Sequence, residues 1–381
     1  MAATKLRRWL IFGGALSVCL PLAAAVLPED RADVLYHAYD GGGVEISGPS
    51  LLLRKTFKDL FSVSANYYVD DVTSASIDVV TTASAYTEKR TQTSLGLDYL
   101  RGKTTLSGNF TRSSENDYEA NTASFSISQD MFGDLTTVRL GYSLGWDTVG
   151  RNGDDNFKED VRRQHYRLGV SQILTKSLLL DLSWEAITDE GFLNNPYRQV
   201  RFIDDGNPNG YGYQPELYPH TRTSNAVALR GLYYLPYRAV LKAGYRYFTD
   251  TWGIDAHTVE LGYSHPIKER WIVDLGYRWY SQTAADFYSD LFPYQDAQNF
   301  LARDKELSTF TSHTFSLGLS YQFAQGGWGF IDRGSLNLGL DHVRYEYDDF
   351  RDLRADGVPA GSEPLYSYSA NVLKLFISLW Y

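Results

Sequence analysis

The stretch that decides the fold is Ala239–Gln282, AVLKAGYRYFTDTWGIDAHTVELGYSHPIKERWIVDLGYRWYSQ. Three times it alternates apolar and polar residues over about ten positions, the length of a membrane strand, and then stops at a turn. In its last segment Asp274 and Arg278 lie between the apolar residues Trp271, Val273, Leu275, Tyr277 and Trp279. Because successive side chains of a β-strand point to opposite faces, this segment has one apolar face and one polar face.

A soluble β-sandwich also contains alternating strands, but two features favour a membrane strand. The segments are long, and aromatic residues lie near the ends of the apolar face, at Trp271 and again at Tyr277 and Trp279. Strands that cross lipid place aromatic rings at both headgroup levels and a polar lumen behind them. The sequence therefore predicts an all-β fold, a transmembrane antiparallel up-and-down β-barrel.

Composition supports a barrel over a helical membrane protein. Aromatic residues make up 15% of the 381 residues, led by 29 Tyr, and the mean hydropathy of −0.33 is too polar for a helical bundle. Beyond the N-terminus the sequence lacks an apolar run of roughly 18 residues, which a spanning helix needs. A membrane protein without such runs must be a closed barrel, since lipid leaves no partner for unpaired backbone groups.

The N-terminus has the pattern of an export signal. Lys5, Arg7 and Arg8 precede an apolar core, and Ala23-Ala24-Ala25 offers a cleavage site. We expect residues 1–25 to be a cleavable signal peptide and residues 26–381 to form one outer-membrane barrel domain. Removing three basic residues shifts the formal net charge from −10 to −13, which argues against a nucleic-acid partner.

The single cysteine, Cys19, lies inside this signal. Lipid attachment there is an alternative, although Val18 is bulky where a lipoprotein signal has a small residue. The mature chain then contains no cysteine, which excludes disulfides, cysteine zinc sites and thiol catalysis.

Alternating segments separated by turns continue along the whole chain. They predict about 16 strands, with 14 as the alternative, and short periplasmic turns that alternate with long extracellular loops. The second strand is interrupted by Gly48-Pro49, and the long loops cover roughly 72–87, 148–161, 189–221, 283–309 and 348–363. The predicted strands lie near 34–40, 44–57, 60–70, 88–101, 103–114, 118–130, 135–147, 162–174, 177–188, 222–235, 238–250, 256–266, 270–282, 311–323, 335–347 and 365–381.

The last strand ends on an aromatic residue, Tyr381, after alternating Leu373, Leu375, Ile377 and Leu379. This resembles the C-terminal signal that the outer-membrane assembly machinery recognises. We therefore expect two partners, outer-membrane lipid and that machinery. The sequence leaves open whether the barrel forms a homo-oligomer.

Several segments resemble an uncharacterised family of Gram-negative outer-membrane proteins, a domain-of-unknown-function family. They are Tyr68–Ser76, Glu88–Leu97, Ser113–Tyr118, Gly191–Val200, Tyr245–Glu260 and Tyr277–Tyr288. The resemblance implies an outer-membrane barrel and a location in a Gram-negative outer membrane, and it supplies no ligand, reaction or site residues. It also implies work beside flavin- or thiol-linked periplasmic proteins.

Charged residues at polar-face positions are the candidate functional residues. In a barrel of about 16 strands they line a water-filled lumen, where mixed charges set ion selectivity or bind a polar solute. The alternative is that they pair across strands and only stiffen the wall, and their near-balanced signs predict no strong ion preference. The candidates are Arg90, Asp98, Arg139, Arg167, Asp181, Glu185, Arg230, Lys242, Arg246, Glu260, Asp274 and Arg278.

Two long loops supply candidates for a plug or lid, because loops beyond roughly 15 residues tend to be functional or disordered. The residues are Asn195, Pro196, Tyr197 and Arg198 in the loop 189–221, and Asp286 and Phe287 in the loop 283–309. Acidic runs at 152–156 and 204–207 offer oxygens to calcium, but they lack the spaced pattern with a closing Glu. Turn chemistry explains them, so we expect neither a metal nor a cofactor.

Seven scattered histidines match no protease or nucleophile motif, and His313 and His342 fall on the predicted outer face. We therefore expect a barrel without catalytic residues, most consistent with a porin-like uptake channel for a small polar solute. Two alternatives stay open. One is a non-conducting or partner-binding scaffold of a periplasmic redox-linked system, plugged by aromatics such as Tyr68, Phe248 and Tyr280. The other is a barrel-embedded hydrolase.

Overall fold

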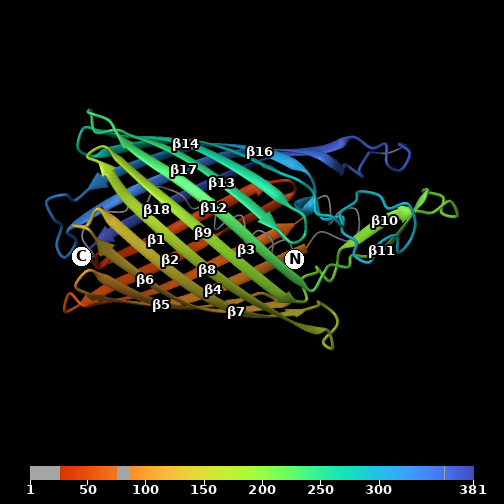
Figure 1. Ribbon diagram of the computed structural model, residues 1–381, viewed down its shortest axis with the longest axis horizontal. Coiled ribbons are helices and arrows are strands. Elements are labelled where there is room, and N and C mark those ends of the chain that lie inside the picture. The colour runs from red at the N-terminus through yellow and green to blue at the C-terminus, as the bar shows by residue number, and fades with distance from the viewer. Residues whose placement is uncertain (1–25, 75–85, 356) are drawn as a thin grey trace.

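The computed structural model describes residues 26–74, 86–355 and 357–381, and this part of the chain folds into a closed antiparallel β-barrel (Figure 1). The expected signal peptide and the centre of the first predicted long loop, 75–85, lie outside the described residues. The barrel strands are β1 (Arg31–Gly41), β2 (Val44–Phe57), β3 (Phe61–Ser74), β4 (Tyr86–Arg101), β5 (Thr104–Ser114), β6 (Tyr118–Met131), β7 (Thr136–Gly150), β8 (Lys158–Thr175), β9 (Leu178–Gly191), β12 (Thr221–Tyr234), β13 (Val240–Asp250), β14 (Asp255–Ile267), β15 (Trp271–Gln282), β16 (Phe310–Phe323), β17 (Arg333–Arg351) and β18 (Leu365–Trp380).

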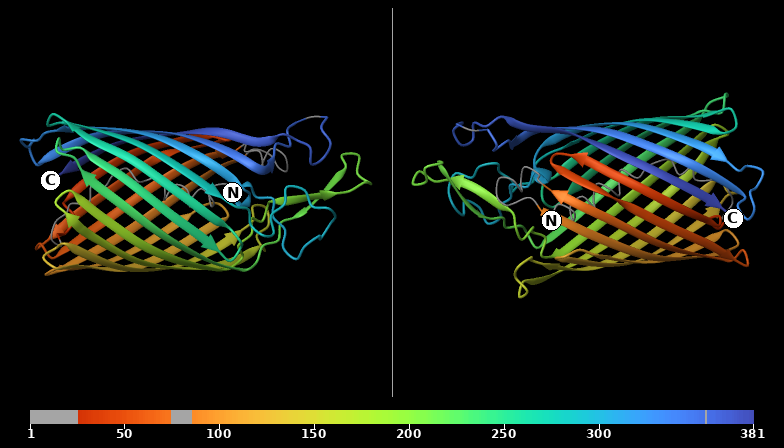
Figure 2. Two further views of the ribbon diagram at one scale, coloured as in Figure 1. Left: turned by 45° about the horizontal axis from the view of Figure 1, so that its top comes forward. Right: turned by 180° about the vertical axis from the view of Figure 1, so that it is seen from behind.

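The barrel closes where the first strand meets the last. β1 pairs with β2 on one side and with β18 on the other, and Arg31 lies opposite Trp380 in that seam (Figure 2). Each other strand pairs with its sequence neighbours, and β9 pairs directly with β12. In the described residues the closed sheet has 16 strands, which confirms the preferred count and the up-and-down order.

The connections differ in length at the two ends of the barrel. One end, called here the turn end, has short connections such as 102–103 and 268–270, together with the start of β1 and the end of β18. The other, the loop end, carries the segments 192–220, 283–309 and 352–364. The predicted alternation of short turns and long loops is therefore confirmed.

The outer wall is apolar over the middle of the barrel and aromatic at both of its margins. Leu275 is 52% exposed and Leu261 54%, as expected for side chains that face lipid. From Trp271 to Trp279 the chain rises about 20 Å along the barrel axis at usual strand rise and tilt, close to the height of a membrane apolar band. Exposed outer aromatics include Phe57, Phe61, Tyr233 and Trp271 towards the turn end, and Tyr67, Phe110, Trp146 and Tyr245 towards the loop end.

Several predicted boundaries at the loop end were wrong. β7 and β8 extend to Gly150 and Lys158, and β17 to Arg351, because backbone pairing continues after the apolar alternation ends. The predicted break at Gly48-Pro49 was also wrong: β2 runs unbroken through these residues, which pair with His37 and Tyr36 of β1, while its pairing with β3 skips them.

The two longest loops also contain structure that the sequence did not predict. The segment 192–220 forms a hairpin of β10 (Gln199–Ile203) and β11 (Tyr211–Pro215), which projects beyond the barrel rim (Figure 1). The segment 283–309 contains a 3-10 helix, η1 (Lys305–Leu307). In the described residues no helix is long and apolar enough to cross a membrane.

Candidate functional site

The polar faces of the strands form the inner wall of the barrel. Ion pairs that reach over an intervening strand, such as Lys242 to Asp274, place both partners on this same face. The predicted lumen residues lie on it as follows: Arg90 and Asp98 on β4, Arg139 on β7, Arg167 on β8, Asp181 and Glu185 on β9, Arg230 on β12, Lys242 and Arg246 on β13, Glu260 on β14, and Asp274 and Arg278 on β15.

Most of these charges form loose pairs across the middle of the barrel. Glu260 lies between two guanidinium groups, 3.8 Å from Arg278 Nε and 4.0 Å from Arg230 Nε. Glu185 lies 3.9 Å from Arg246 Nη2. The side chains of Arg230 and Glu260 are 52% and 37% exposed, so these pairs form a solvent-accessible wall.

Two further pairs on the wall are closer. Arg139 Nη1 lies 3.5 Å from Asp181 Oδ2, and Lys242 Nζ lies 3.3 Å from Asp274 Oδ1. Cross-strand pairing, the alternative in which the charges only stiffen the wall, is therefore present at these positions. Partly exposed pairs of this kind contribute little stability, about 0–1 kcal/mol each.

Arg90 belongs to a tighter cluster near the loop end. Its Nη2 lies 2.7 Å from Asp70 Oδ2, and His37 Nε2 lies 2.7 Å from Asp70 Oδ1. His37 also stacks on Tyr68, with ring centroids 4.8 Å apart. Asp70 is 2% exposed, and the cluster joins β1, β3 and β4. These contacts give Arg90 a structural role.

Asp98, the other candidate on β4, is also closely held. Arg54 Nη1 on β2 donates to Asp98 Oδ2 at 2.7 Å, and Ser107 Oγ donates to Asp98 Oδ1 at 2.6 Å. Arg54 and Asp98 lie on the wall of the barrel that is opposite the arginine-rich strands β12–β15. This pair is well suited to rigidify the wall between β2 and β5.

A row of aromatic side chains follows the inner wall from β15 to β18, and we call it the aromatic arc. It consists of Tyr280, Phe310, Tyr345 and Tyr368, with ring centroids separated by 5.5 Å, 6.2 Å and 4.7 Å in that order. Tyr280, Tyr345 and Tyr368 are partly exposed, whereas Phe310 is buried. Such ring contacts contribute about 0.5–1.5 kcal/mol each and hold the ring planes in place.

A second layer supports the arc from the loop side. Tyr347, Phe350 and Tyr366 are buried and pack against it as one cluster. The sequence-based candidates included Tyr280 but missed Tyr345 and Tyr368. The sequence could have identified Tyr345 and Tyr368, because strand alternation on β17 and β18 places each of them on the inward face.

The long loops are fixed to one another by a buried arginine. Arg201 on β10 is fully buried and donates from Nη1 to Glu363 Oε1 at 2.5 Å and from Nε to the backbone oxygen of Asp290 at 2.9 Å. Arg303 Nη2 donates to Asp290 Oδ1 at 2.8 Å. These contacts join the hairpin, the loop 283–309 and the loop 352–364 into one body, which we call the cap.

The two carboxylates around Arg201 determine its electrostatics. Burial alone favours loss of the proton, but the hydrogen bond that Arg201 donates to Glu363 and the charge of Asp290 together raise the pKa of Arg201 above its ordinary value. For Glu363, burial opposes ionisation, yet the contacts with Arg201 hold its pKa below the usual value. Arg201 and Glu363 therefore remain charged.

An apolar cluster joins the cap to the inner wall. Tyr218, Trp252 and Phe287 pack with ring centroids 5.2–5.5 Å apart, and Phe248 of the inner wall packs against them. Tyr288 of the loop 283–309 packs against the layer behind the aromatic arc. The cap is thus anchored over the β12–β18 side of the mouth.

The lid candidates of the hairpin loop lie within the cap. Asn195 Oδ1 accepts from Tyr197 N at 3.0 Å, Pro196 O accepts from Arg151 Nη2 at 3.1 Å, and Arg198 forms an ion pair with Asp304. These contacts hold the loop 192–220 against two neighbouring connections of the loop end.

The lid candidates of the other long loop are also ordered. Asp286 N donates to Trp252 O at 2.8 Å, and Phe287 lies in the apolar cluster described above. Both candidate segments therefore belong to the cap.

Three carboxylates gather beneath the hairpin loop. Glu88 at the start of β4, Glu115 and Asp117 have oxygens within 4.8 Å of one another, and Tyr197 Oη donates to Asp117 Oδ2 at 2.6 Å. Burial, with Glu88 nearby, raises the pKa of Glu115 to about 7, and burial also raises the pKa of Asp117. Such oxygens suit a hard divalent cation, although proton uptake by Glu115 relieves the same repulsion.

The two acidic runs considered for calcium use their carboxylates in turns. Asp204 Oδ1 accepts from Gly206 N at 3.0 Å, and Asp154 Oδ1 accepts from Asn156 N at 3.2 Å. These are Asx-turn hydrogen bonds, as turn chemistry predicted.

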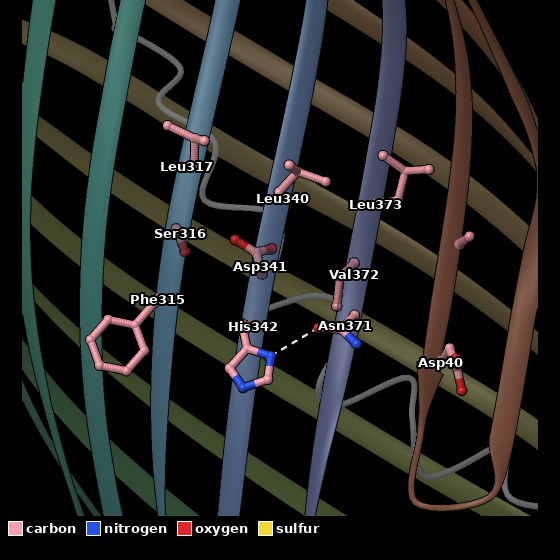
Figure 3. A pocket seen from close by; sticks show the side chains of 11 residues that line it. Asp40, Phe315, Ser316, Leu317, Leu340, Asp341, His342, Asn371, Val372 and Leu373 are labelled. Carbon is pink, nitrogen blue, oxygen red and sulfur yellow. Dashed lines mark hydrogen bonds between the residues drawn. The ribbon is translucent and has the colours of Figure 1, made fainter.

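A recess on the outer wall lies apart from the lumen. Leu317, Leu340 and Leu373 form its apolar part, and His342 Nδ1 pairs with Asn371 Oδ1 at 2.8 Å along one margin (Figure 3). His313, the other histidine predicted to face outward, pairs with Tyr277 Oη at 2.9 Å. These groups face the membrane side of β15–β18 and take no part in the inner wall.

Comparison with protein families gives one match. A family model described as "Protein of unknown function (DUF3570)" matches residues 79–330, more than half of the chain. The chain belongs to this family. The resemblance seen in segments such as Gly191–Val200 is thereby confirmed, and the family description carries no activity. Among curated proteins the sequence has no significant match.

Solved structures with a similar fold are outer-membrane proteins. A bacterial polysaccharide outer membrane secretin matches with a TM-score of 0.50 and 9% identity, over 93% of this chain and 100% of that one. OmpT of Vibrio cholerae matches with a TM-score of 0.43 and 10% identity over 94% and 100%. The siderophore receptor PirA from Pseudomonas aeruginosa matches with 0.43 and 11% over 84% of this chain and 57% of the receptor. The secretin supports the barrel fold and nothing further.

The buried arginine of the cap yields a test. Replacing Arg201 with Ala leaves Asp290 and Glu363 charged and without that partner, a change that costs about 3–5 kcal/mol in buried ion pairs. We expect the cap of the R201A variant to be cleaved by protease while the barrel stays resistant. Arg354→Ala, which removes a half-exposed pair with Asp352, is the control and should leave the cleavage rate unchanged. A protease-resistant cap in R201A would contradict the assigned role.

The raised pKa of Glu115 predicts a pH-dependent stability. The folded state holds this proton up to about pH 7, whereas the unfolded chain releases it near 4.5, the ordinary pKa of a glutamate carboxyl. Stability therefore falls as pH rises between these values, by up to about 3 kcal/mol, and stays low above pH 7. Thermal unfolding of Glu115→Gln should lack this fall and exceed the wild type at pH 8. Glu119→Gln, an exposed neighbour, should keep the wild-type profile.

Proposed function

We propose that the protein is an outer-membrane channel through which small polar solutes pass. The observation that carries the proposal is the half-exposed ion-pair wall around Glu260, inside a closed barrel whose outer wall is apolar. Barrels of 16 strands are wide enough for an aqueous channel. Charges on a wetted inner wall lower the cost of moving a polar solute past a low-dielectric barrier.

The proposed orientation follows from the two ends of the barrel. The short connections, the start of β1 and the end of β18 lie at the turn end. We place this end in the periplasm of a Gram-negative cell, so the cap lies outside the cell. The alternating last strand, β18, supports recognition by the outer-membrane assembly machinery, after export through the expected signal peptide. Lipid is the proposed partner of the outer wall.

In this proposal, the cap restricts which solutes enter the channel. Its apolar cluster is anchored on Phe248 and its aromatic layer on the arc, so it covers the β12–β18 side of the mouth. A fixed cap of this kind favours selection by size and chemistry over opening and closing of a mobile lid.

The second candidate is a barrel that binds a partner at the cell surface, because the orientation proposed above places the cap outside; the scaffold of a periplasmic redox-linked system stays a sequence-based alternative. One observation favours it: the β10–β11 sheet has only two strands, and Ile203 and Tyr213 on it are 45% and 39% exposed. The outer edge of β10 is already hydrogen-bonded to the backbone of Phe292, so the edge of β11 is the one suited to pairing with a strand of another chain.

We propose no catalytic step. A hydrolase triad needs a histidine beside a nucleophile. Instead, the histidines contact other groups of the walls and loops: His37 with Asp70, His165 with Glu185, His220 with the Gly191 carbonyl, His257 with Tyr245, His265 with Tyr263, His313 with Tyr277 and His342 with Asn371.

Conductance in planar lipid bilayers tests the channel. Purified protein should give stepwise open-channel currents in potassium chloride. Replacing residues 196–216 with a short Gly-Ser linker removes the hairpin of the cap, and we expect a larger conductance because the mouth widens.

A smaller deletion serves as the control for this experiment. Removing only 206–209, at the tip of the hairpin, leaves Arg201 and the anchors of the cap in place, and the conductance should not change. Bilayers that stay silent both before and after removal of 196–216 would contradict the channel and favour the partner-binding barrel.

A further inference from the structure

The middle of the inner wall carries a local surplus of positive charge. From β7 to β15, apart from the neutral pair Lys242–Asp274, five guanidinium groups in this part of the wall face three carboxylates, a surplus of two positive charges. Acidic residues elsewhere in the lumen lie nearer its ends, for example Asp147 and Asp189 beside Arg163. The group consists of Arg139, Arg167, Arg230, Arg246 and Arg278 with Asp181, Glu185 and Glu260. The whole-lumen balance expected from sequence therefore conceals a cationic region.

The contacts within this region are long. Arg230, Arg246 and Arg278 lie 3.8–4.0 Å from their carboxylate partners, whereas Arg54 lies 2.7 Å from Asp98 on the opposite wall. A guanidinium group has five N–H donors in a fork that matches carboxylate and phosphate oxygens. Arg230 and Arg278, which share Glu260, have donor capacity beyond that one carboxylate, and an anionic solute fits that capacity.

The aromatic arc begins where the cationic region ends. Arg278 and Tyr280 are successive inward residues of β15, and the Arg278 guanidinium lies 5.1 Å from the Tyr280 ring centroid. Arg246 lies 5.5 Å from the Phe248 ring centroid in the same way on β13. Both arginines therefore lie at the border between a charged surface and an aromatic surface.

The rings of the arc are positioned to receive another ring. Tyr345 and Tyr368 stack with an interplanar angle of 16° and remain partly exposed, backed by buried Tyr347 and Tyr366. Tyr280 is oriented by its hydroxyl, which donates to Gln282 Oε1 at 2.6 Å. A rigid aromatic surface loses little conformational entropy on binding a flat partner.

Small inward residues surround the border on the turn side. Next to Arg278 along the wall stand Gly262, Gly276 and Ser316, so that long side chains do not project into the lumen at these positions. A Cβ added at Gly276 would lie 3.1 Å from Ser316 Cβ, so this packing tolerates little more bulk in the wall. The border is thus accessible from the lumen below the cap.

We propose that this border binds ring-shaped solutes that bear an anionic group, with the anion at Arg230, Arg246 and Arg278 and the ring against Tyr280 and its neighbours in the arc. The inference rests on the proposed function in that it names the class of solute for the same lumen. The arginines alone favour any anion, and the aromatic arc alone favours any ring. Because the two surfaces are adjacent, they favour solutes that carry both groups.

Equilibrium binding to the folded, detergent-solubilised protein tests the proposal without requiring an open channel. Isothermal titration calorimetry compares three probes: phenyl phosphate, inorganic phosphate and benzylammonium. We expect phenyl phosphate to bind about tenfold or more tightly than either of the others, since a ring contact and a charge contact each contribute on the scale of one tenfold step.

Matched variants separate the two halves of the site. Arg278→Gln should weaken phenyl phosphate about tenfold, and Tyr280→Leu should remove the preference for phenyl phosphate over inorganic phosphate. Tyr280→Phe keeps the ring and should keep that preference. Arg54→Gln, on the far wall, is the control that should bind as the wild type does. Heat-modifiable migration on electrophoresis verifies that each variant is folded.

The outcomes separate this inference from the channel proposal. Equal affinity for phenyl phosphate and inorganic phosphate, equal affinity for benzylammonium, or no heat of binding for any probe would overturn the inference. Preferential binding together with silent bilayers would leave the inference standing and refute the channel. Open-channel currents without preferential binding would do the reverse.

Discussion

The structure depends on one constraint: inside lipid, each backbone N–H and C=O must find its partner within the protein. A sheet satisfies this condition only when it has no edge. The pairing of β1 with β18 removes the edges, and the other strands can cross lipid only because of it. Once the sheet is closed, strand alternation divides every segment between lipid and lumen. Leu275 and Asp274, adjacent in sequence, therefore lie on opposite faces of the barrel wall.

The same constraint explains why the barrel and the cap are stabilised by different interactions. Within the barrel, backbone pairing and apolar burial in lipid supply the order, and the inner wall is free to carry loose, wet charge pairs such as Arg278–Glu260. Above the membrane this support ends, and the loops need a core of their own. They obtain it from the buried Arg201 network and the apolar cluster around Trp252. The proposed function uses both parts, a wetted wall and a fixed cap.

The predictability of each part follows from the range of its interactions. Alternation in Trp271–Gln282 is local, so it predicted strand faces, strand count and outward residues such as His313. The cap depends on contacts between distant segments, for example Arg201 with Glu363, and local periodicity contains no trace of them. The sequence predicted nearly balanced charge among the lumen candidates, whereas the clustering of arginines beside the aromatic arc required the register of the strands, such as β14–β16.

The central claim is that a single strand faces lipid on one side and water on the other. The expected mature chain has no cysteine, so single cysteines can be placed at each position from 272 to 280 and labelled with a charged, membrane-impermeant thiol reagent. We expect fast labelling at positions 274, 276 and 278 and slow labelling at 273, 275 and 277. Uniformly slow labelling on both faces would contradict a water-filled lumen, and uniformly fast labelling would contradict the lipid-facing wall.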